Sequence, residues 1–324
     1  MTILVTGGAG YIGSAFVARC LGFREPVVVL DDLSTGHRDA VPEDVPFARG
    51  RVDDRELVRE LVRRHGVDVC VHFAGFIDVA ESVSDPLRYF ANNTVATVAL
   101  LEALVGEGVR RFVFSSTAAV YGEPERTPIP EDHPCRPASP YGRSKRMVEA
   151  MLSDLDRAVG MRAVTFRYFN AAGAYGDAVE RHHPETHLIP NALAAAAGER
   201  DALVVHGEDF STRDGTALRD YVHVGDLADA HLIAVERLRE GMPSGLFNLG
   251  SGAGTTVREV IDAVERVTGR RVPCRVGPRR AGDVAALVAD PRRAREVLGW
   301  SPVYPSIDAI VKTAWDARRA LTSP

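Results

Sequence analysis

The chain has 324 residues, of which 45% are hydrophobic and 26% charged, so it is globular and large enough for two core regions. Its net charge of −5 at pH 7 and sequence pI of about 6.1 give no support to nucleic-acid binding. No apolar stretch approaches the roughly 20 residues that cross a bilayer, and Met1 leads straight into a strand-like run without the features of a signal peptide.

The first 20 residues predict a strand, a glycine turn and a helix. An apolar run at 2–6 is followed at once by Gly7, Gly10 and Gly13, and then by apolar residues at helical spacing. Gly7 allows a tight turn, Gly10 lets the backbone approach a pyrophosphate at the helix N-terminus, and Gly13 lets the helix pack close to the strand. The spacing is G-x-x-G-x-x-G rather than the commoner G-x-G-x-x-G, but the context is that of a dinucleotide-binding turn.

A second predicted strand, residues 26–31, ends in Asp31, about 20 residues after the glycines. A carboxylate here can accept a hydrogen bond from a ribose 2′-hydroxyl and would repel a 2′-phosphate, which favours NAD over NADP. The alternative is that Asp31 is a turn or cap residue, because residues 32–36 have the composition of a turn.

Strand and helix patterns continue to alternate, which indicates parallel strands with crossover helices. We expect a buried strand at 67–75, a helix that begins at Asp85-Pro86 and runs to about 106, and a strand at 111–117. Residues 123–140 contain six prolines and predict a loop across the mouth of a site. A helix from Tyr141 and a strand at 162–170 follow.

The pattern becomes less regular after residue 174. Helices are predicted at 190–197, 257–268 and 306–320, and strands near 202–206, 221–224 and 245–249. We therefore expect an α/β protein with a Rossmann-type, doubly wound parallel sheet in residues 1–174. Residues 175–324 should form mainly a smaller α/β lid, with a segment at about 220–250 returning to the first domain.

Tyr141 and Lys145 are the candidate catalytic pair. Residues four apart lie on one face of a helix, and a phenol titrates near pH 10, so it is a poor base at neutral pH. A neighbouring ammonium stabilises the phenolate and is expected to lower the pKa of Tyr141, with a positively charged cofactor ring adding to the effect.

Five motifs together resemble the extended short-chain dehydrogenase/reductase family, and within it the 4-epimerases that interconvert UDP-glucose and UDP-galactose. They are Gly7–Gly13, Phe114–Gly122, Tyr141 with Lys145, Arg167–Asn170 and Arg219–Val224. The resemblance implies that Tyr141 takes the proton from the sugar O4 while tightly bound NAD accepts the C4 hydride. Lys145 would hold the nicotinamide ribose, and Thr117 would bond O4. The 4-keto sugar then presents its other face, and the hydride returns.

The resemblance also implies the binding residues. For NAD they are Gly7, Gly10, Tyr11, Ile12, Gly13, Asp31, Asp32, Val52, Phe73, Ala74, Gly75, Asn92, Ser115, Tyr141, Lys145 and Tyr168. For the UDP-sugar, held by residues 175–324, they are Thr117, Asn170, His187, Leu188, His206, Arg219, Arg280, Asp283 and Leu287. Family members are homodimers joined by a four-helix bundle, here the helices from Asp85 and Tyr141.

Four departures from the family pattern bear on recognition. Arg51 stands where an Asp usually bonds the adenine amino group, although Asp53 is near in sequence, and Ile77 replaces a Lys found in some members. His206 replaces an aromatic residue at the uracil. Leu287 stands where a bulky Tyr in some members excludes N-acetylated sugars, so UDP-N-acetylhexosamines are candidate substrates.

Several other interpretations were weighed. A nucleotide-sugar 4,6-dehydratase needs an acid/base pair after the Thr, but Thr117 is followed by Ala118-Ala119. A 4-epimerase of a UDP-pentose or UDP-uronate stays open, whereas the intact catalytic trio argues against a non-catalytic NAD sensor. His182, His183 and His187 suggest a metal, but no cysteine or carboxylate cluster has ligand spacing, so no metal is expected.

The four cysteines, Cys20, Cys70, Cys135 and Cys274, are scattered without a C-x-x-C pair. Cys20 and Cys70 lie within apolar patterns and are expected to be reduced core residues. This usage predicts a cytoplasmic protein.

Overall fold

The computed structural model describes residues 1–280 and 283–322. Its centre is a seven-stranded sheet with the order β10-β6-β5-β4-β1-β2-β3, in which every neighbouring pair is parallel. The strands are β1 (Thr2–Thr6), β2 (Val27–Asp31), β3 (Phe47–Arg49), β4 (Val67–His72), β5 (Arg111–Thr117), β6 (Arg162–Tyr168) and β10 (Gly245–Leu249). The predicted doubly wound α/β fold is confirmed.

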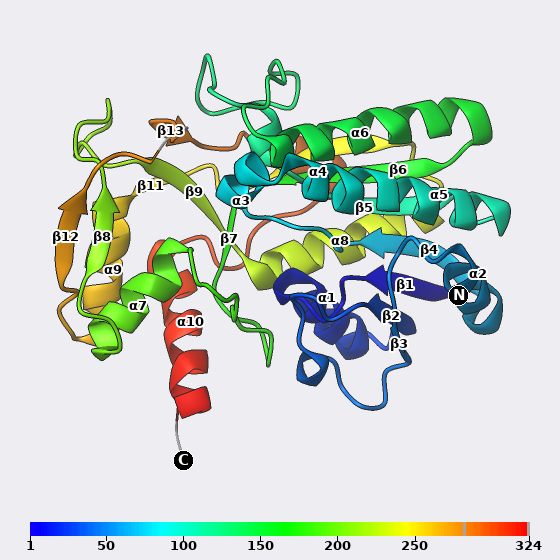
Figure 1. The fold of residues 1–324 in the computed structure, drawn as a ribbon, viewed down its shortest axis with the longest axis horizontal. Helices are drawn as coiled ribbons and strands as arrows, with labels where there is room; N and C mark the ends of the chain where they lie inside the picture. The colour runs from blue at the N-terminus through cyan, green and yellow to red at the C-terminus, as the bar shows by residue number, and fades with distance from the viewer. Residues whose placement is uncertain (281–282, 323–324) are drawn as a thin grey trace.

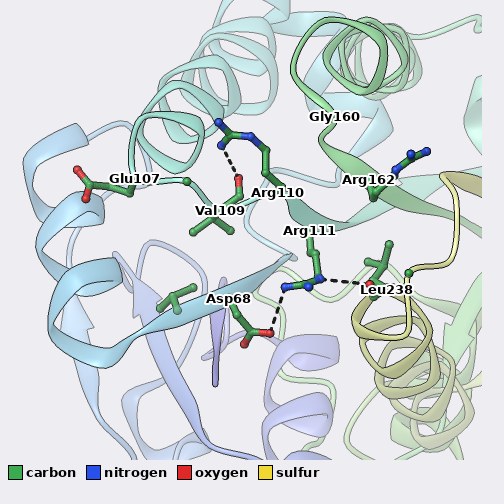
Figure 2. Close-up of a pocket in the computed structure, with 11 residues that line it drawn as sticks. Asp68, Glu107, Val109, Arg110, Arg111, Gly160, Arg162 and Leu238 are labelled. Atoms are coloured by element: carbon green, nitrogen blue, oxygen red, sulfur yellow. Dashed lines mark hydrogen bonds and ion pairs between the residues drawn. The ribbon is translucent and has the colours of Figure 1, made fainter.

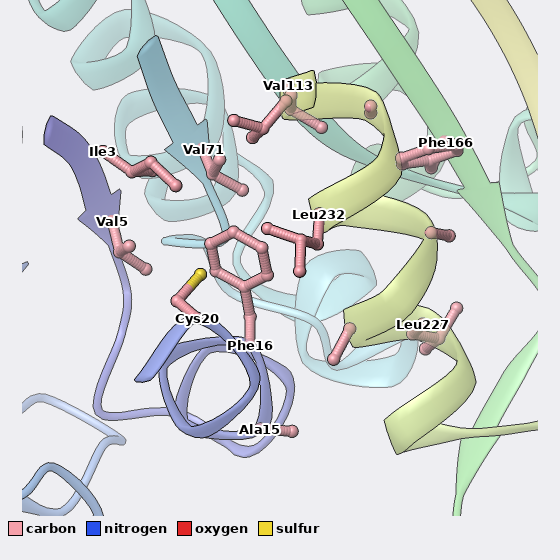
Figure 3. Close-up of a cluster of buried hydrophobic side chains, with 14 of the residues drawn as sticks. Ile3, Val5, Ala15, Phe16, Cys20, Val71, Val113, Phe166, Leu227 and Leu232 are labelled. Atoms are coloured by element: carbon pink, nitrogen blue, oxygen red, sulfur yellow. The ribbon is translucent and has the colours of Figure 1, made fainter. Parts of the chain in front are cut away.

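Helices cover both faces of this sheet, which explains why its strands have nearly continuous apolar sequences. One core cluster joins the sheet to α1 (Tyr11–Gly22) and α8 (Val224–Arg239). Figure 3 shows Phe16 of α1 between Val71 of β4 and Leu232 of α8. The opposite cluster joins the sheet to α2 (Arg55–His65), α5 (Ala96–Gly106) and α6 (Pro140–Val159).

The later part of the chain forms two smaller sheets and a separate core. In one sheet β9 (Leu218–His223) pairs with β7 (Asn170–Ala172), β11 (Gly254–Thr256) and β13 (Ala286–Leu287); in the other β8 (Leu203–His206) pairs with β12 (Cys274–Gly277). The third core cluster includes α7 (Leu188–Ala197), α9 (Val257–Thr268) and α10 (Ile307–Thr322). Figure 1 shows these helices gathered at the opposite end of the molecule from β1–β3.

Short helical segments connect the main elements. Residues 79–95 form α3 (Val79–Ser84), α4 (Pro86–Tyr89) and a π-helical turn (Phe90–Val95) that continues into α5; the remaining short turns are Arg38–Ala40, Ala118–Val120 and Ala294–Leu298. Asp85 is the N-cap of α4 with Pro86 in its first turn, as expected. Within the described residues, no helix has both the length and the apolar character that a membrane crossing requires.

The sequence did not predict two of the helices, and one predicted strand is divided in the structure. Helices α2 and α8 were not predicted: α2 is rich in charge, and α8 follows β9 without an intervening loop, because His223 ends the strand and caps the helix. The strand expected at 162–170 is divided, because the chain leaves the large sheet after Tyr168 and enters the smaller one at Asn170. The domain boundary at residue 174 stays a prediction; the pairing of β10 with β6 supports the return of the later segment.

A buried ion pair joins α6 to the sheet. Both nitrogens of the Arg167 fork bond the Glu149 carboxylate, at 2.9 and 2.7 Å, and both side chains are at most 3% exposed. Ser116 of β5 donates to the same carboxylate at 2.6 Å, and the Arg167 guanidinium lies 4.7 Å from the centre of the Tyr121 ring. The pair therefore connects β5, β6 and α6 at one point.

Replacing Arg167 by Met should lower the free energy of unfolding by about 3–5 kcal/mol, because the Glu149 carboxylate would lose its buried partner and keep only the exposed Arg146 as a cation. Urea unfolding followed by circular dichroism measures this loss. Arg157→Met is the matched control: its partner Asp154 is on the same helix, the pair is exposed, and less than about 1 kcal/mol should be lost. Equal effects of the two substitutions would contradict this account.

Candidate active site

The predicted residues meet at the carboxyl ends of β1 and β4. The sheet changes direction here, since β2 and β3 lie on one side of β1 and β4 to β6 on the other. In such sheets ligands bind in the crevice at this reversal point. The turn after β1 and the segment after β4 are in close contact, because a methyl group at Gly7 would lie 2.5 Å from the Ala74 nitrogen.

The glycine turn has the shape that an anion-binding helix start needs. Gly7 has φ +71°, in the left-handed region that favours glycine, and Gly10 is the N-cap of α1 without a capping side chain. A methyl group at Gly13 would lie 2.1 Å from the Gly7 carbonyl oxygen, so the turn can pack on the helix only with glycine there. The first backbone N–H groups of α1 are left for an anion.

Asp31 fixes this turn as well as facing the crevice. Its carboxylate accepts from the Ala9 nitrogen at 2.9 Å and from the Leu33 nitrogen at 2.8 Å, and it is only 8% exposed. Burial raises the pKa of Asp31, and the two backbone bonds partly offset that rise. The turn-residue and cofactor interpretations of Asp31 are thus compatible, since each carboxylate oxygen has a further lone pair.

Arg51 lies near Asp32, the residue that follows Asp31, and it pairs with acidic side chains. It forms a two-point pair with Asp53 at 3.0 and 3.1 Å and lies 3.7 Å from Asp32. Asp32 also accepts from the Ser34 nitrogen, and Val52 packs against the second core cluster. Each Asp53 oxygen keeps a further lone pair, so Asp53 can accept from an adenine amino group while it stays paired with Arg51.

The catalytic candidates Thr117 and Tyr141 are in contact. Their side chains lie close enough for Thr117 to act on the Tyr141 phenol, although they come from the end of β5 and the first turn of α6. Gly142 makes this possible, because a side chain there would meet the Ala119 carbonyl oxygen at 2.6 Å. Ser139 caps the helix by accepting from the Gly142 nitrogen at 3.1 Å.

Lys145 lies one turn further along α6 and is 4% exposed. Its ammonium lies 5.1 Å from the centre of the Phe114 ring and would be 3.3 Å from a methyl group at Gly75. Burial lowers the pKa of Lys145 to about 8. The predicted Tyr141, Lys145 and Gly75 are thus brought together in one dry crevice.

In the chain without a cofactor, the pKa of Tyr141 is raised and not lowered. Burial raises the pKa of Tyr141, and the bond to Thr117 only partly opposes that rise. The expected lowering of the phenol pKa by Lys145 together with a positively charged cofactor ring stays a prediction, because burial in the chain alone disfavours a charge on the phenol.

A hydrogen-bonded chain below the crevice orients Ser115 and Tyr168. The His231 ring donates through Nδ1 to the Leu227 carbonyl at 2.7 Å, so its Nε2 accepts from the Tyr168 hydroxyl at 2.5 Å. Tyr168 in turn accepts from Ser115 at 2.8 Å. Burial lowers the pKa of His231 to about 4, which keeps this ring neutral at pH 7. Phe73 packs on the same ring at 4.7 Å.

Asn93 is a site residue that the sequence analysis missed in favour of its neighbour Asn92. Its amide bonds the Phe76 nitrogen at 2.8 Å and the Phe76 carbonyl at 2.9 Å, and it reaches Ser144 of α6 at 3.3 Å. Asn92 bonds only Asn93, at 3.1 Å, among the contacts of the described residues. Asn93 therefore holds the segment after Gly75 against the catalytic helix; a signal was available, since a polar side chain lay on the buried side of a helical pattern.

The predicted UDP-sugar residues divide into two groups. Arg219 of β9 is bonded to the Leu218 and Val284 carbonyls, both at 2.9 Å, and lies 3.6 Å from Asp283. Burial lowers the pKa of Arg219, although Asp283 opposes this. Leu287 of β13 lies beside Arg219 in the strand register and packs near Ala118, close to Thr117.

The other predicted substrate residues lie on separate elements. Asn170 begins β7, His187 caps α7 directly before Leu188, and His206 ends β8 with Nδ1 donating to the Pro278 carbonyl at 3.1 Å. Arg280 is exposed, whereas Arg279 bonds Asp209 at 2.6 Å. This difference favours Arg280 as the free arginine of the pair. Ile77 is 43% exposed.

A hollow of about 590 Å³ lies elsewhere, at the amino ends of the strands (Figure 2). Arg110, Arg111 and Arg162 border it, but Arg110 bonds the Val105 and Val109 carbonyls and Arg111 bonds the Leu238 carbonyl. Parallel sheets bind their ligands at the carboxyl ends. The hollow is therefore not the catalytic site.

Comparison with known proteins gives a consistent result. The model of the NAD dependent epimerase/dehydratase family matches residues 3–250. The chain belongs to this family. A UDP-glucose 4-epimerase of Lacticaseibacillus casei is 49% identical over 98% of this chain and 96% of its own length.

Solved structures agree with the family assignment. The UDP-glucose 4-epimerase of Brucella ovis in complex with NAD is 46% identical, with a TM-score of 0.94 over 97% of each chain. The UDP-Glc/GlcNAc 4-epimerase of Campylobacter jejuni is 40% identical, with a TM-score of 0.86 over 98% of this chain and 99% of that chain. The extended short-chain dehydrogenase fold is thereby confirmed.

The residues present fit NAD. The uncapped start of α1 at Gly10 suits a pyrophosphate, and the clash at Gly13 leaves no alternative to glycine. Asp31 stands at the end of β2, where it suits an unphosphorylated ribose.

Gly13→Ala should reduce the NAD that remains with the purified protein by at least about 10-fold, because the added methyl group forces the turn away from the helix. Chromatography of the supernatant after acid denaturation measures NAD per chain. Gly22→Ala is the matched control, since a methyl group there meets no atom within 4 Å. Full NAD content in Gly13→Ala would show that the turn tolerates the displacement.

Proposed function

We propose that this protein is an NAD-dependent 4-epimerase that interconverts UDP-glucose and UDP-galactose through a 4-keto intermediate. The observation that carries the proposal is the placement of Tyr141 near Thr117, with buried Lys145 one turn further along α6, at the mouth of the dinucleotide crevice. The relatives of nearly full length named UDP-glucose 4-epimerase support this substrate.

Each catalytic residue has one physical task. Tyr141 takes the proton of the sugar 4-hydroxyl and later returns it, and Thr117 donates to or accepts from the same oxygen. Lys145 bonds the ribose next to the reacting ring and holds it against Gly75. Bound NAD supplies the hydride acceptor, and the same molecule becomes the donor later in the cycle.

Burial of these groups protects the intermediate. Tyr141 is 9% exposed and Lys145 4%, so the proton and the keto sugar are kept from water. Thr117 is followed by Ala118 and Ala119, which carry no group to remove water from the sugar. This favours epimerisation over 4,6-dehydration.

Proton NMR of the purified protein with UDP-galactose and no added cofactor tests the proposal. Conversion to a UDP-glucose-rich mixture is expected, with NAD retained from expression. Activity that appears only after NAD is added would point to weakened retention at Arg51. No conversion in either sample, without or with added NAD, would refute the hexose substrate and favour a UDP-pentose or UDP-uronate.

Tyr141→Phe should lower kcat by about 10²–10⁴-fold, because the proton acceptor is removed while the ring still fills its place. The rate is measured by the same NMR conversion, together with NAD content as a check on folding. Tyr304→Phe, which keeps its stacking on His223, is the control and should retain normal activity. A fully active Tyr141→Phe variant would refute the catalytic assignment.

UDP-N-acetylhexosamines are a second proposed substrate class. Leu287 is only half-buried next to Arg219, and it leaves more room than a tyrosine would. The likeness to a UDP-Glc/GlcNAc 4-epimerase supports this proposal.

Leu287→Tyr should reduce turnover of UDP-N-acetylglucosamine at least about 10-fold and leave that of UDP-galactose within about threefold, because only the acetyl group needs the space. Leu287→Met, which conserves volume, is the control. The idea fails if the wild-type protein converts neither acetylated sugar at enzyme levels that readily convert UDP-galactose.

We propose a homodimer formed through α3–α6, whose surface carries apolar side chains at high exposure. Val83, Leu87 and Val95 are 64%, 78% and 65% exposed, and Met147 of α6 is 46% exposed. Association of two such faces would remove them from water. Leu87→Glu should shift the protein toward monomer in sedimentation equilibrium, whereas a wild-type monomer at micromolar concentration would refute the proposal.

The protein is also proposed to be cytoplasmic. Its four cysteines are free thiols, two of them fully buried, which suits a reducing compartment. Cell fractionation with detection of the native protein tests this location.

A further inference from the structure

The segment between β7 and α7 gathers a group of potential metal ligands that the catalytic proposal does not use. Glu180, His182 and His187 each offer one ligand atom, and these atoms all lie within 4.8 Å of one another. The sequence predicted no metal because no carboxylate stood at recognised ligand spacing from the histidines. The fold supplies the missing carboxylate by turning Glu180 toward both rings.

The Glu180 carboxylate lies between the two imidazoles and is only 9% exposed. One of its oxygens contacts His182 Nδ1, and the other lies 3.7 Å from His187 Nδ1. Burial raises the pKa of Glu180, but its contacts with His182 and His187 outweigh burial and lower it. The carboxylate is therefore a nearly buried group that faces both imidazole rings.

Glu185 completes the group. Its Oε1 atom lies 2.8 Å from His187 Nδ1 and accepts from the His187 nitrogen at 2.7 Å. A carboxylate bonded to one ring nitrogen is the usual partner of a metal-binding histidine, because it fixes the ring orientation. Glu185 holds His187 through Nδ1, so His187 would offer its Nε2 atom to the ion.

We propose that Glu180, His182 and His187 bind a zinc-class divalent transition metal ion, with Glu185 orienting His187. Two imidazoles and one carboxylate are a recurrent Zn²⁺ ligand set. Bonds of about 2.0–2.2 Å place tetrahedral ligand atoms roughly 3.4 Å apart, so the contacting pair of Glu180 and His182 has to open while the wider separations, at most 4.8 Å, close. Metal binding then replaces the protons that the rings share with Glu180.

The surrounding contacts hold the backbone of this segment in place. Arg181, between two of the ligands, pairs with Asp39 at 2.8 and 3.0 Å. The Tyr11 hydroxyl donates to the Gly173 carbonyl at 2.6 Å, which fixes the start of the segment against the first turn of α1. A metal here would cross-link three positions within this one segment.

Isothermal titration of the full-length protein with Zn²⁺, without substrate, tests the site. One ion per chain is expected, and His182→Ala should bind at least 10-fold more weakly. His65→Ala removes a half-buried histidine at the end of α2 and should bind as tightly as wild type. Equal affinity in His182→Ala and wild type, or no binding by wild type at millimolar Zn²⁺, would overturn the proposal.

Co²⁺ provides a second readout that identifies the ligand types. Visible d–d bands of low-symmetry Co²⁺ are expected without a thiolate charge-transfer band, because the proposed ligands are nitrogen and oxygen. A thiolate band would place the ion at a cysteine, such as exposed Cys274, and would refute the assignment.

The ion should also inhibit turnover, a consequence that rests on the proposed function because it takes His187 away from the UDP-sugar. Zn²⁺ should raise the apparent KM for UDP-galactose, EDTA should reverse the effect, and His182→Ala should keep its activity and become insensitive. Absent turnover in all variants would refute the proposed function, while the titration would still decide the metal site. Binding without any change in KM would refute the coupling alone.

Discussion

The buried pair of Arg167 and Glu149 is the contact on which the catalytic geometry depends. Glu149 lies on the same face of α6 as Tyr141 and Lys145, since the three are spaced by four residues. Arg167 and Ser116 hold that carboxylate from two adjacent strands, and Ser116 immediately precedes Thr117. The height of α6 along the sheet, and with it the distance from Tyr141 to Thr117, is thereby set by charge-assisted bonds rather than by apolar packing, which tolerates sliding.

The dryness that protects the reaction also determines the charge states in the crevice. Burial raises the pKa of Tyr141 and lowers that of Lys145 to about 8, so the phenol is neutral and the lysine is still mainly an ammonium at pH 7. Burial has the same effect on His231 beneath Tyr168: it lowers the pKa of this ring to about 4, so the ring is neutral and adds no charge below the crevice. The protein thus supplies shape, hydrogen bonds and the Lys145 ammonium, and a positively charged cofactor ring adds to the charge near the phenol.

Much of the site could be predicted because short sequence motifs contain its main residues. The strand-glycine-helix unit, Asp31 at the end of β2, and Tyr141 with Lys145 depend on backbone sterics and helical spacing that any sequence window shows. Helix α8 was not predicted, because His223 serves both as the last strand residue and as the cap, with no turn residue between.

Contacts between distant segments left no such signal. Asn93 and the Glu180 cluster acquire their meaning only when separate segments meet, and the division after Tyr168 depends on a second sheet that begins elsewhere. The opposing pKa shifts were missed for a related reason: the depth of burial is a property of the whole fold, and desolvation exceeded the pairwise attraction.

The position of β10 affects how the protein folds during its synthesis on the ribosome. This edge strand, residues 245–249, pairs with β6, and α8 just before it covers the face of the sheet that α1 alone cannot cover. A nascent chain that stops at residue 174 has therefore an open β6 edge and a bare apolar face. Until about three quarters of the chain has been synthesised, the sheet exposes an unpaired strand edge that can pair with other chains. We therefore expect chaperones that shield strand edges to matter most during this interval of synthesis.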